Sequence, residues 1–299
     1  MQNIISPQQL LLLLVLTNAG GEGKTLLSLL LRALLNLSDE AVGVLDADGG
    51  NYSAAYRMHS AGDQDGVRTV RWGTDADRAE QIVGDHVGKH MIFDSGANMA
   101  AANREIMGLL PELRRQVAAL SYRPVVFLPV STNKAGAVGA IKELAPKIEQ
   151  FEQVFVRVNR DGSANFEAGL DPKHTIDVGW LQPGLQNYVD HAGGLVRAVT
   201  MAPPGYELAA DMVCDWMRNF AEQPLVQQII GSGPANALEH LGRSKPAVTR
   251  FHLKVLASTT NEEILNNQRR ARTMAILDEG KWSAHSLRQA ADLIDAGAI

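Results

Sequence analysis

Cysteine and long apolar runs are nearly absent from this sequence. Cys214 is the only cysteine among 299 residues, so neither an intramolecular disulfide nor a thiolate-rich metal site can form, which favours a reducing, cytoplasmic compartment. The longest apolar run near the start, Leu10 to Leu16, is much shorter than the roughly 20 residues that a membrane-spanning helix needs. Residues 1–9 carry no basic side chain of the kind that opens a secretory signal. We therefore expect neither export nor membrane insertion.

Strong net charge is missing as well. The formal net charge of −5 is too small to indicate a nucleic-acid partner by itself. An apolar content of 45% and a charged content of 20% are those of an ordinary globular protein, with enough apolar area to offset the entropy of ordering the chain. A chain of this length can form one large domain with an appendage.

Short apolar, β-branched segments alternate with longer segments of helical spacing. We expect strands near residues 10–16, 41–46, 67–72, 90–94, 124–130, 153–158 and 175–181. We expect helices over residues 25–37, 75–87, 101–120 and 134–150. Parallel strands need crossover connections, and this alternation supplies them. The pattern predicts an α/β fold with a mostly parallel sheet between two layers of helices.

The second half of the chain contains a change of pattern. Residues 203–230 indicate a closing helix, and Gly231-Ser232-Gly233-Pro234 is typical of a linker, because glycine and proline break both periodicities. Residues 235–299 are helical in pattern. We therefore predict a first domain of residues 1–230 and a helical C-terminal appendage of residues 231–299.

The apolar run at Leu10–Leu16 leads into Asn18-Ala19-Gly20-Gly21-Glu22-Gly23-Lys24-Thr25. A triphosphate site needs converging backbone N–H groups, a helix N-terminus, a lysine for the β and γ oxygens and a hydroxyl on Mg²⁺. A turn that only joins strand to helix would also use glycines, but it would not need Lys24 and Thr25. The sequence therefore predicts a phosphate-binding loop, with contacts from Gly20, Gly21, Glu22, Gly23, Lys24, Thr25 and Leu26.

Acidic residues end two of the expected strands. One strand ends in Asp46-Ala47-Asp48-Gly49-Gly50-Asn51 and another in Asp94-Ser95-Gly96-Ala97. Both clusters would lie at the sheet edge from which the loop departs, where ligands bind in parallel α/β sheets. Carboxylates there can hold Mg²⁺ or orient a water toward the γ-phosphate. The alternative is that each acid only caps a helix or forms a turn.

These residues together resemble a known family. The order Gly-Gly-x-Gly-Lys-Thr, then Asp-x-Asp with a nearby Asn, then an apolar strand with Asp-Ser-Gly is similar to the ParA/MinD group of P-loop ATPases over about residues 8–230. The resemblance implies that Lys24 binds the β and γ phosphates, that Asp48 orients the hydrolytic water, and that Asn159 and Pro183 contact the adenine. It also implies that the Mg²⁺ is surrounded by Thr25, Asp48 and Asp94.

The resemblance further implies an ATP-dependent homodimer that serves plasmid maintenance, conjugation or cargo positioning. The signature lysine of the family falls at Ala19, and a methyl group cannot stabilise charge on the leaving oxygens, so we expect slow hydrolysis. Relatives on conjugative plasmids, of the StbB and TraL kind, also have unusual loops, and in this feature the sequence resembles them. The altered string at Asp46–Asn51 argues against a close partition homologue.

Two further segments leave alternatives open. Thr132-Asn133-Lys134-Ala135-Gly136 is similar to a guanine-reading motif but ends in Gly136 where an acid is needed, which favours adenine over guanine. Residues 237–251 have helix-turn-helix spacing, and with the arginines up to residue 272 they would either contact DNA or form a packing hairpin. Two rival functions therefore remain: a nucleotide-binding regulator that contacts DNA through this tail, and a small-molecule kinase or amidoligase.

Overall fold

The computed structural model describes residues 9–17, 20–47, 67–69, 87–95 and 104–243. By its own contacts the chain divides into two compact units, residues 1–202 with 209–243 and residues 203–208 with 244–299. The described residues thus belong almost entirely to the first unit. Within these ranges no helix combines the length and the apolar character that crossing a membrane requires.

The first unit is built on a seven-stranded sheet in the order β3-β2-β4-β1-β5-β6-β7. Neighbouring strands all run parallel. The central strand β1 lies between β4 and β5, with β3, β2 and β4 on one side and β5, β6 and β7 on the other. The strands are β1 (Leu11–Val15), β2 (Val42–Ala47), β3 (Val67–Thr69), β4 (His90–Ser95), β5 (Arg123–Ser131), β6 (Glu152–Val158) and β7 (Thr175–Val178).

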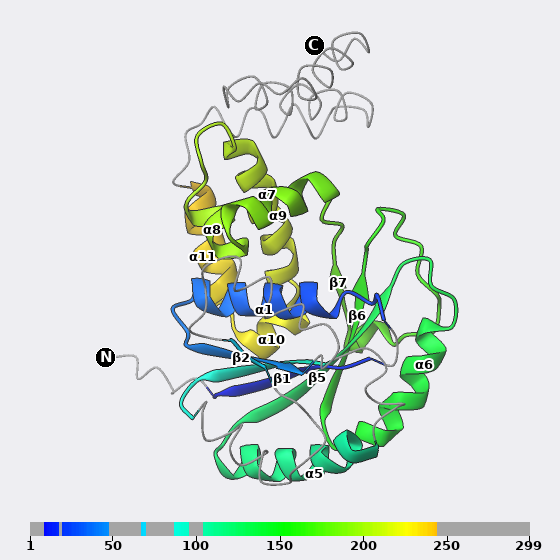
Figure 1. The fold of residues 1–299 in the computed structure, drawn as a ribbon. Helices are drawn as coiled ribbons and strands as arrows, with labels where there is room; N and C mark the ends of the chain where they lie inside the picture. The colour runs from blue at the N-terminus through cyan, green and yellow to red at the C-terminus, as the bar shows by residue number, and fades with distance from the viewer. Residues whose placement is uncertain (1–8, 18–19, 48–66, 70–86, 96–103, 244–299) are drawn as a thin grey trace. The chain divides into compact units, whose positions relative to one another are not determined.

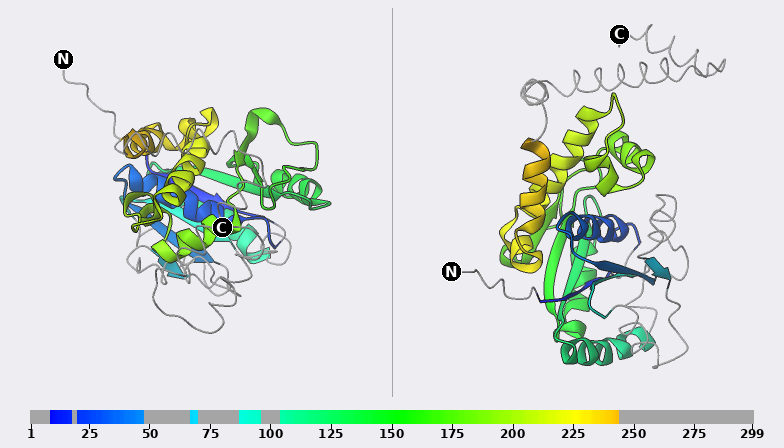
Figure 2. Two further views of the ribbon diagram at one scale, coloured as in Figure 1. Left: turned by 90° about the horizontal axis from the view of Figure 1, so that it is seen from above. Right: turned by 90° about the vertical axis from the view of Figure 1, so that its left-hand side faces the viewer.

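Helices cover both faces of this sheet. Helices α5 and α6 lie on one face, and α1 lies on the other with α8 and α11 packed against it (Figures 1 and 2). This arrangement confirms the predicted α/β class. The helices are α1 (Lys24–Leu37), α5 (Arg104–Ala119), α6 (Ala137–Leu144), α7 (Pro183–Ala192), α8 (Leu195–Thr200), α9 (Glu207–Ala221), α10 (Pro224–Ile230) and α11 (Gly233–Arg243), with short 3-10 turns η1 (Ala145–Ile148) and η2 (Pro172–His174).

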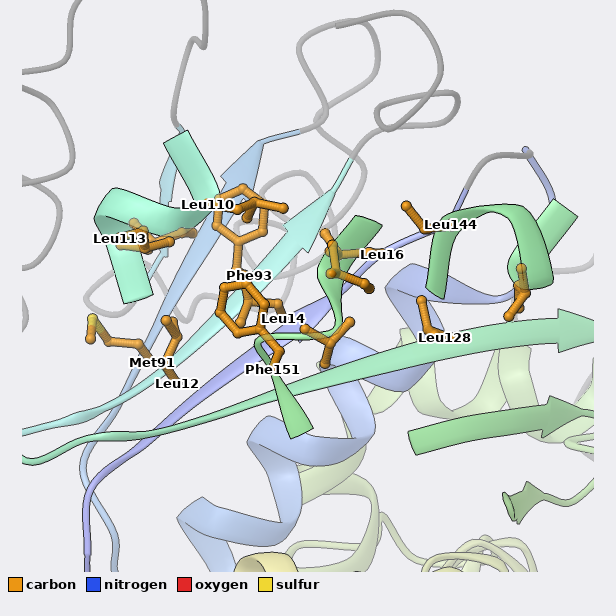
Figure 3. Packing of buried hydrophobic residues seen from close by; sticks show 14 of the residues in the cluster. Leu12, Leu14, Leu16, Met91, Phe93, Leu110, Leu113, Leu128, Leu144 and Phe151 are labelled. Carbon is orange, nitrogen blue, oxygen red and sulfur yellow. The ribbon is translucent and has the colours of Figure 1, made fainter. Parts of the chain in front are cut away.

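The core explains the unbroken apolar run of β1. Successive side chains of a strand point to opposite faces, and all five residues of β1 are buried, so both faces must be apolar. One face packs against α5 and α6 through Leu12, Leu14, Phe93 and Leu128 (Figure 3). Each such side chain stabilises the fold by about 1.5–3 kcal/mol. Helix α1 is buried on several sides, as its leucines predict.

Several elements differ from their predicted bounds for identifiable reasons. The expected closing helix over 203–230 is two helices, α9 and α10, because Pro224 has no N–H to continue the first one and instead begins the second. Residues 134–136 form a turn before α6, which starts after Gly136 at φ +78°. Strand β7 ends at Val178 rather than 181. The expected helix over 75–87 and the end of the third expected strand, residues 70–72, fall almost entirely outside the described residues.

The beginning of the predicted appendage, up to residue 243, is part of the first unit. Gly231 at φ +79° ends α10, and α11 begins two residues later and lies against α1. Leu238 of α11 is fully buried, and its carbonyl accepts a hydrogen bond from the Cys214 thiol at 3.6 Å. The predicted boundary at residue 231 stays a prediction, because residues 244–299, and most of the segment proposed for DNA contact, lie outside the described residues.

Candidate functional site: the loop between β1 and α1

The loop that follows β1 is shaped by two glycines. The Leu16 N–H donates to the Phe127 carbonyl at 3.0 Å and continues the sheet past the end of β1. Gly21 and Gly23 then take φ values of +75° and +83°, a region that other L-residues rarely adopt. The chain thereby turns sharply enough for α1 to begin at Lys24. Two residues of the loop, Asn18 and Ala19, lie outside the described ones.

Gly23 also leaves no room for a side chain. A Cβ at this position would lie 2.7 Å from Cγ1 of Val158 on β6, closer than atoms can pack. Gly23 is the N-cap of α1, and the first turn of the helix contains no acidic residue. The N-terminus of α1 is therefore electropositive through its dipole and suited to an anion. Lys24, which is largely buried, and Thr25 stand at this end of the helix.

The acidic strand ends lie in register beside the loop. Val15 of β1 is paired with Asp94 of β4, and Asp94 is paired with Asp46 of β2. Asp94 is almost fully buried, at 1% exposure. The two acidic strand ends are thus placed at the edge from which the loop departs, as the sequence predicted. Asp48 lies outside the described residues, and the roles assigned to the acids stay predictions.

Glu22, which the sequence assigns to nucleotide contact, has its carboxylate engaged within the protein. The side chain is 1% exposed. Its Oε2 accepts from the Ser131 N–H at 2.6 Å, and its Oε1 is 2.7 Å from Nζ of Lys134. A nucleotide contact by Glu22 would therefore use its backbone N–H.

Two cations that sequence reasoning did not assign to the site bind the loop backbone. Lys134 Nζ donates to the Gly20 carbonyl, and Arg160 Nη1 donates to the Gly21 carbonyl. Both residues come from the segments directly after β5 and β6. The signal that could have identified them was their place just beyond strands on the same side of β1, because the carboxyl ends of parallel strands share one edge.

The two predicted base-contacting residues follow neighbouring strands, Asn159 after β6 and Pro183 after β7. The Asn159 N–H donates to the Val178 carbonyl at 2.9 Å. The side-chain Oδ1 of Asn159 accepts from the Gly162 N–H at 2.9 Å, and this bond shapes the turn after β6. Pro183 opens α7, where a missing N–H costs nothing.

Asn133, from the segment similar to a guanine-reading motif, uses its side chain elsewhere. Its Nδ2 donates to Asp161 at 2.5 Å and to Ser163 at 3.0 Å, and its Oδ1 accepts from Asn165 at 2.6 Å. Hydrogen bonds from Ser163 hold the pKa of Asp161 well below its ordinary value. The bond from the Ser163 backbone N–H contributes most, and the bond from its hydroxyl comes next. Asn133 thus stabilises the loop after β6.

The residues present fit a magnesium nucleotide. The N-terminus of α1, reached through the left-handed Gly21 and Gly23, suits phosphate, and Lys24 supplies positive charge. The hydroxyl of Thr25 and the carboxylate of Asp94 are hard oxygen ligands of the kind that Mg²⁺ prefers. Sheet order, loop and helix together form the P-loop type of α/β fold that the sequence predicted.

Comparison with known proteins gives likeness of fold at low identity. No protein-family model matches the chain, and no curated protein matches it. The signal recognition particle receptor FtsY from Elizabethkingia anophelis in complex with GDP is 18% identical over 55% of this chain and 53% of its own, with a TM-score of 0.40. This chain thus matches about half the length of that receptor.

Cell division proteins are matched over more of their length. A chain of the MinC:MinD complex from Aquifex aeolicus is 13% identical over 71% of this chain and 96% of its own, with a TM-score of 0.43. MinD complexed with Mg-ADP from Pyrococcus horikoshii is 14% identical over 79% and 99%, with a TM-score of 0.37. The fold assignment rests on the sheet and loop of this chain.

Proposed function

We propose that this protein is a Mg²⁺-dependent ATP-binding switch of the ParA/MinD type, a slow ATPase whose nucleotide state controls dimerisation and partner binding. The carrying observation is the loop between β1 and α1, where Gly21 and Gly23 in left-handed conformations lead into the largely buried Lys24. A turn that only connects a strand to a helix has no need of a buried lysine at its end. A phosphate-binding loop does use such a lysine, because its ammonium group donates to the phosphate oxygens at the N-terminus of the helix.

Each residue of the site has a distinct role in this proposal. Lys24 binds the β and γ phosphate oxygens as a charged donor. Thr25, Asp94 and Asp48 hold the Mg²⁺, which neutralises phosphate charge. Asp48 also orients the attacking water. Asn159 and Pro183 contact the adenine: the Oδ1 of Asn159 is engaged by Gly162, so its Nδ2 is the group that donates to a base nitrogen.

The setting is proposed from the family resemblance. Ala19 replaces a lysine that in relatives would reach the phosphates of the partner subunit, so turnover is slow and binding dominates. We place the protein in the cytoplasm, as a homodimer in plasmid maintenance, conjugation or cargo positioning. Residues 237–272 are the proposed DNA contact.

The first experiment measures binding of a fluorescent ATP analogue with and without Mg²⁺. Lys24→Ala should lower the affinity about 100-fold, because a charge-assisted bond to phosphate is lost. Lys147→Met is the matched control, since Lys147 is exposed on η1, outside the loop. Competition by ATP and GTP shows which base is preferred. Unchanged affinity in Lys24→Ala would overturn the assignment.

The second experiment separates switch, regulator and enzyme. A switch must associate differently in its nucleotide states, so the molecular mass in solution should rise with ATP relative to ADP and to no nucleotide. Asp48→Ala should keep binding and lose turnover. Stimulation of turnover by DNA supports the switch, binding with no turnover supports a regulator, and dependence on a small acceptor supports a kinase or amidoligase.

A further inference from the structure

The loop backbone is held from one side by two cations. Lys134, after β5, donates to the Gly20 carbonyl, and Arg160, after β6, donates to the Gly21 carbonyl. These two carbonyls are consecutive, so two adjacent peptide groups are engaged. Lys134 lies 114 residues along the chain from Gly20, and Arg160 lies 139 residues from Gly21, so only the sheet brings them together.

Peptide geometry determines where the opposite ends of these groups point. In a planar trans peptide, the C=O of one residue and the N–H of the next point in opposite directions, and the described part of the chain has no cis peptide. The N–H groups of Gly21 and Glu22 therefore point away from Lys134 and Arg160. A cation on the carbonyl also polarises the peptide and strengthens its N–H as a donor.

We propose that Lys134 and Arg160 are positioning residues that hold the Gly20–Gly21 and Gly21–Glu22 peptides with their N–H groups toward the phosphates. This inference rests on the proposed nucleotide site. The cations themselves stay on the carbonyl side of the loop and do not touch the phosphates. The loop then needs no reorientation of these peptides when nucleotide binds, so the free-energy cost of binding is lower.

Lys134 has a second task, created by Glu22. A carboxylate within a phosphate-binding loop would repel the ligand, yet Glu22 is buried and compensated by Lys134 and the Ser131 N–H. Removal of Lys134 would leave that charge buried without its counter-ion next to the phosphates. The loop therefore tolerates Glu22 only because Lys134 accompanies it.

The test compares single and double variants by the affinity for a fluorescent ATP analogue with Mg²⁺. Lys134→Met should lower the affinity about 10- to 100-fold, because the Gly20–Gly21 peptide loses its positioning contact and the buried Glu22 charge loses its counter-ion. Glu22→Gln/Lys134→Met should recover part of that loss, because the glutamine keeps the shape of Glu22 and removes its charge. Arg160→Met should lower the affinity about tenfold, and Arg160→Lys should lie between it and the wild type.

Controls separate positioning from general destabilisation. Lys147→Met and Arg114→Met remove exposed cations from η1 and α5, and both should bind like the wild type. Affinities are measured well below each variant's thermal midpoint without nucleotide, so that all molecules compared are folded.

The possible outcomes are distinct. Wild-type affinity in both Lys134→Met and Arg160→Met, with binding lost in Lys24→Ala, overturns this inference and leaves the proposed function standing. A loss in Lys134→Met that the double variant does not relieve also overturns it, because a lysine on the phosphates would give that result. If the wild type itself binds no nucleotide, the proposed function fails first.

Discussion

Substitution of Gly23 by alanine tests the geometry of the loop most directly. Gly23 has a φ of +83°, and a Cβ there would lie 2.7 Å from Cγ1 of Val158, with the Val158 Cβ and Cγ2 at 3.3 and 3.4 Å. The new methyl group thus meets a β-branched side chain that is fully buried in β6. Such a side chain has one strongly preferred rotamer and little room to move.

The expected cost has two parts. Holding alanine in a left-handed conformation costs about 1–2 kcal/mol. Overpacking against a close-packed core costs about 1–3 kcal/mol more. The free energy of unfolding should therefore fall by about 2–5 kcal/mol, since neither part can relax without moving the start of α1.

Gly136→Ala is the matched control. Gly136 is likewise the N-cap of a helix, α6, with a φ of +78°, but a Cβ there would have nothing within 4 Å. It should show the conformational cost alone, about 1–2 kcal/mol. Both variants and the wild type are compared by urea unfolding.

The double variant Gly23→Ala/Val158→Ala isolates the contact. A coupling free energy of about 1–3 kcal/mol in the double-mutant cycle should appear, because removing the valine methyls relieves the overlap. Equal costs for Gly23→Ala and Gly136→Ala, together with a coupling near zero, would refute the reasoning about Val158.

Three further predictions concern stability away from the loop. Desolvation lowers the pKa of the buried His90, so as the pH falls below about 6.5 the unfolded chain takes up a proton before the folded one and stability declines. His90→Gln should reduce the decline of the urea midpoint between about pH 7.5 and about pH 5.5, and an unchanged decline would contradict this. Leu238→Ala should cost about 2–5 kcal/mol in urea unfolding, because Leu238 is fully buried where α11 joins the unit; a cost typical of a surface site would contradict that packing. Trp216→Phe should cost about 1–2 kcal/mol, measured the same way, through loss of the 2.7 Å hydrogen bond from its Nε1 to the Gly179 carbonyl; a neutral result would assign that bond no net value.

Local patterns predicted the elements that carry strong local signals. The unbroken apolar run before the glycines predicted β1, and the leucine spacing after Thr25 predicted α1, both within two residues of their observed bounds. Helix α7 was not predicted although Pro183 begins it and Gly193 at φ +86° ends it, two ordinary boundary signals. The break between α9 and α10 was not predicted either, although Pro224, which causes it, is visible in the sequence.

The sequence predicted the parts of the site that lie in the loop itself or at the ends of strands. Asp94 and Asp46 could be placed at one edge because strand ends of a parallel sheet meet there. The same rule places Ser131 and Lys134 at that edge, but it does not predict that they contact Glu22. Ser131 lies 109 residues from Glu22, and no periodicity relates them. In the sequence, Lys134 was interpreted only as part of a segment similar to a guanine-reading motif.

The sequence by itself determined the loop between β1 and α1, since its glycines, the lysine after them and the apolar strand before them are adjacent residues. Only the tertiary structure decided what surrounds that loop. The strand order places β5 next to β1 and β6 next to β5, and so brings Lys134 and Arg160 to the carbonyls of Gly20 and Gly21. Contacts between residues more than a hundred positions apart depend on which strands become neighbours, and that is decided by the packing of the whole sheet.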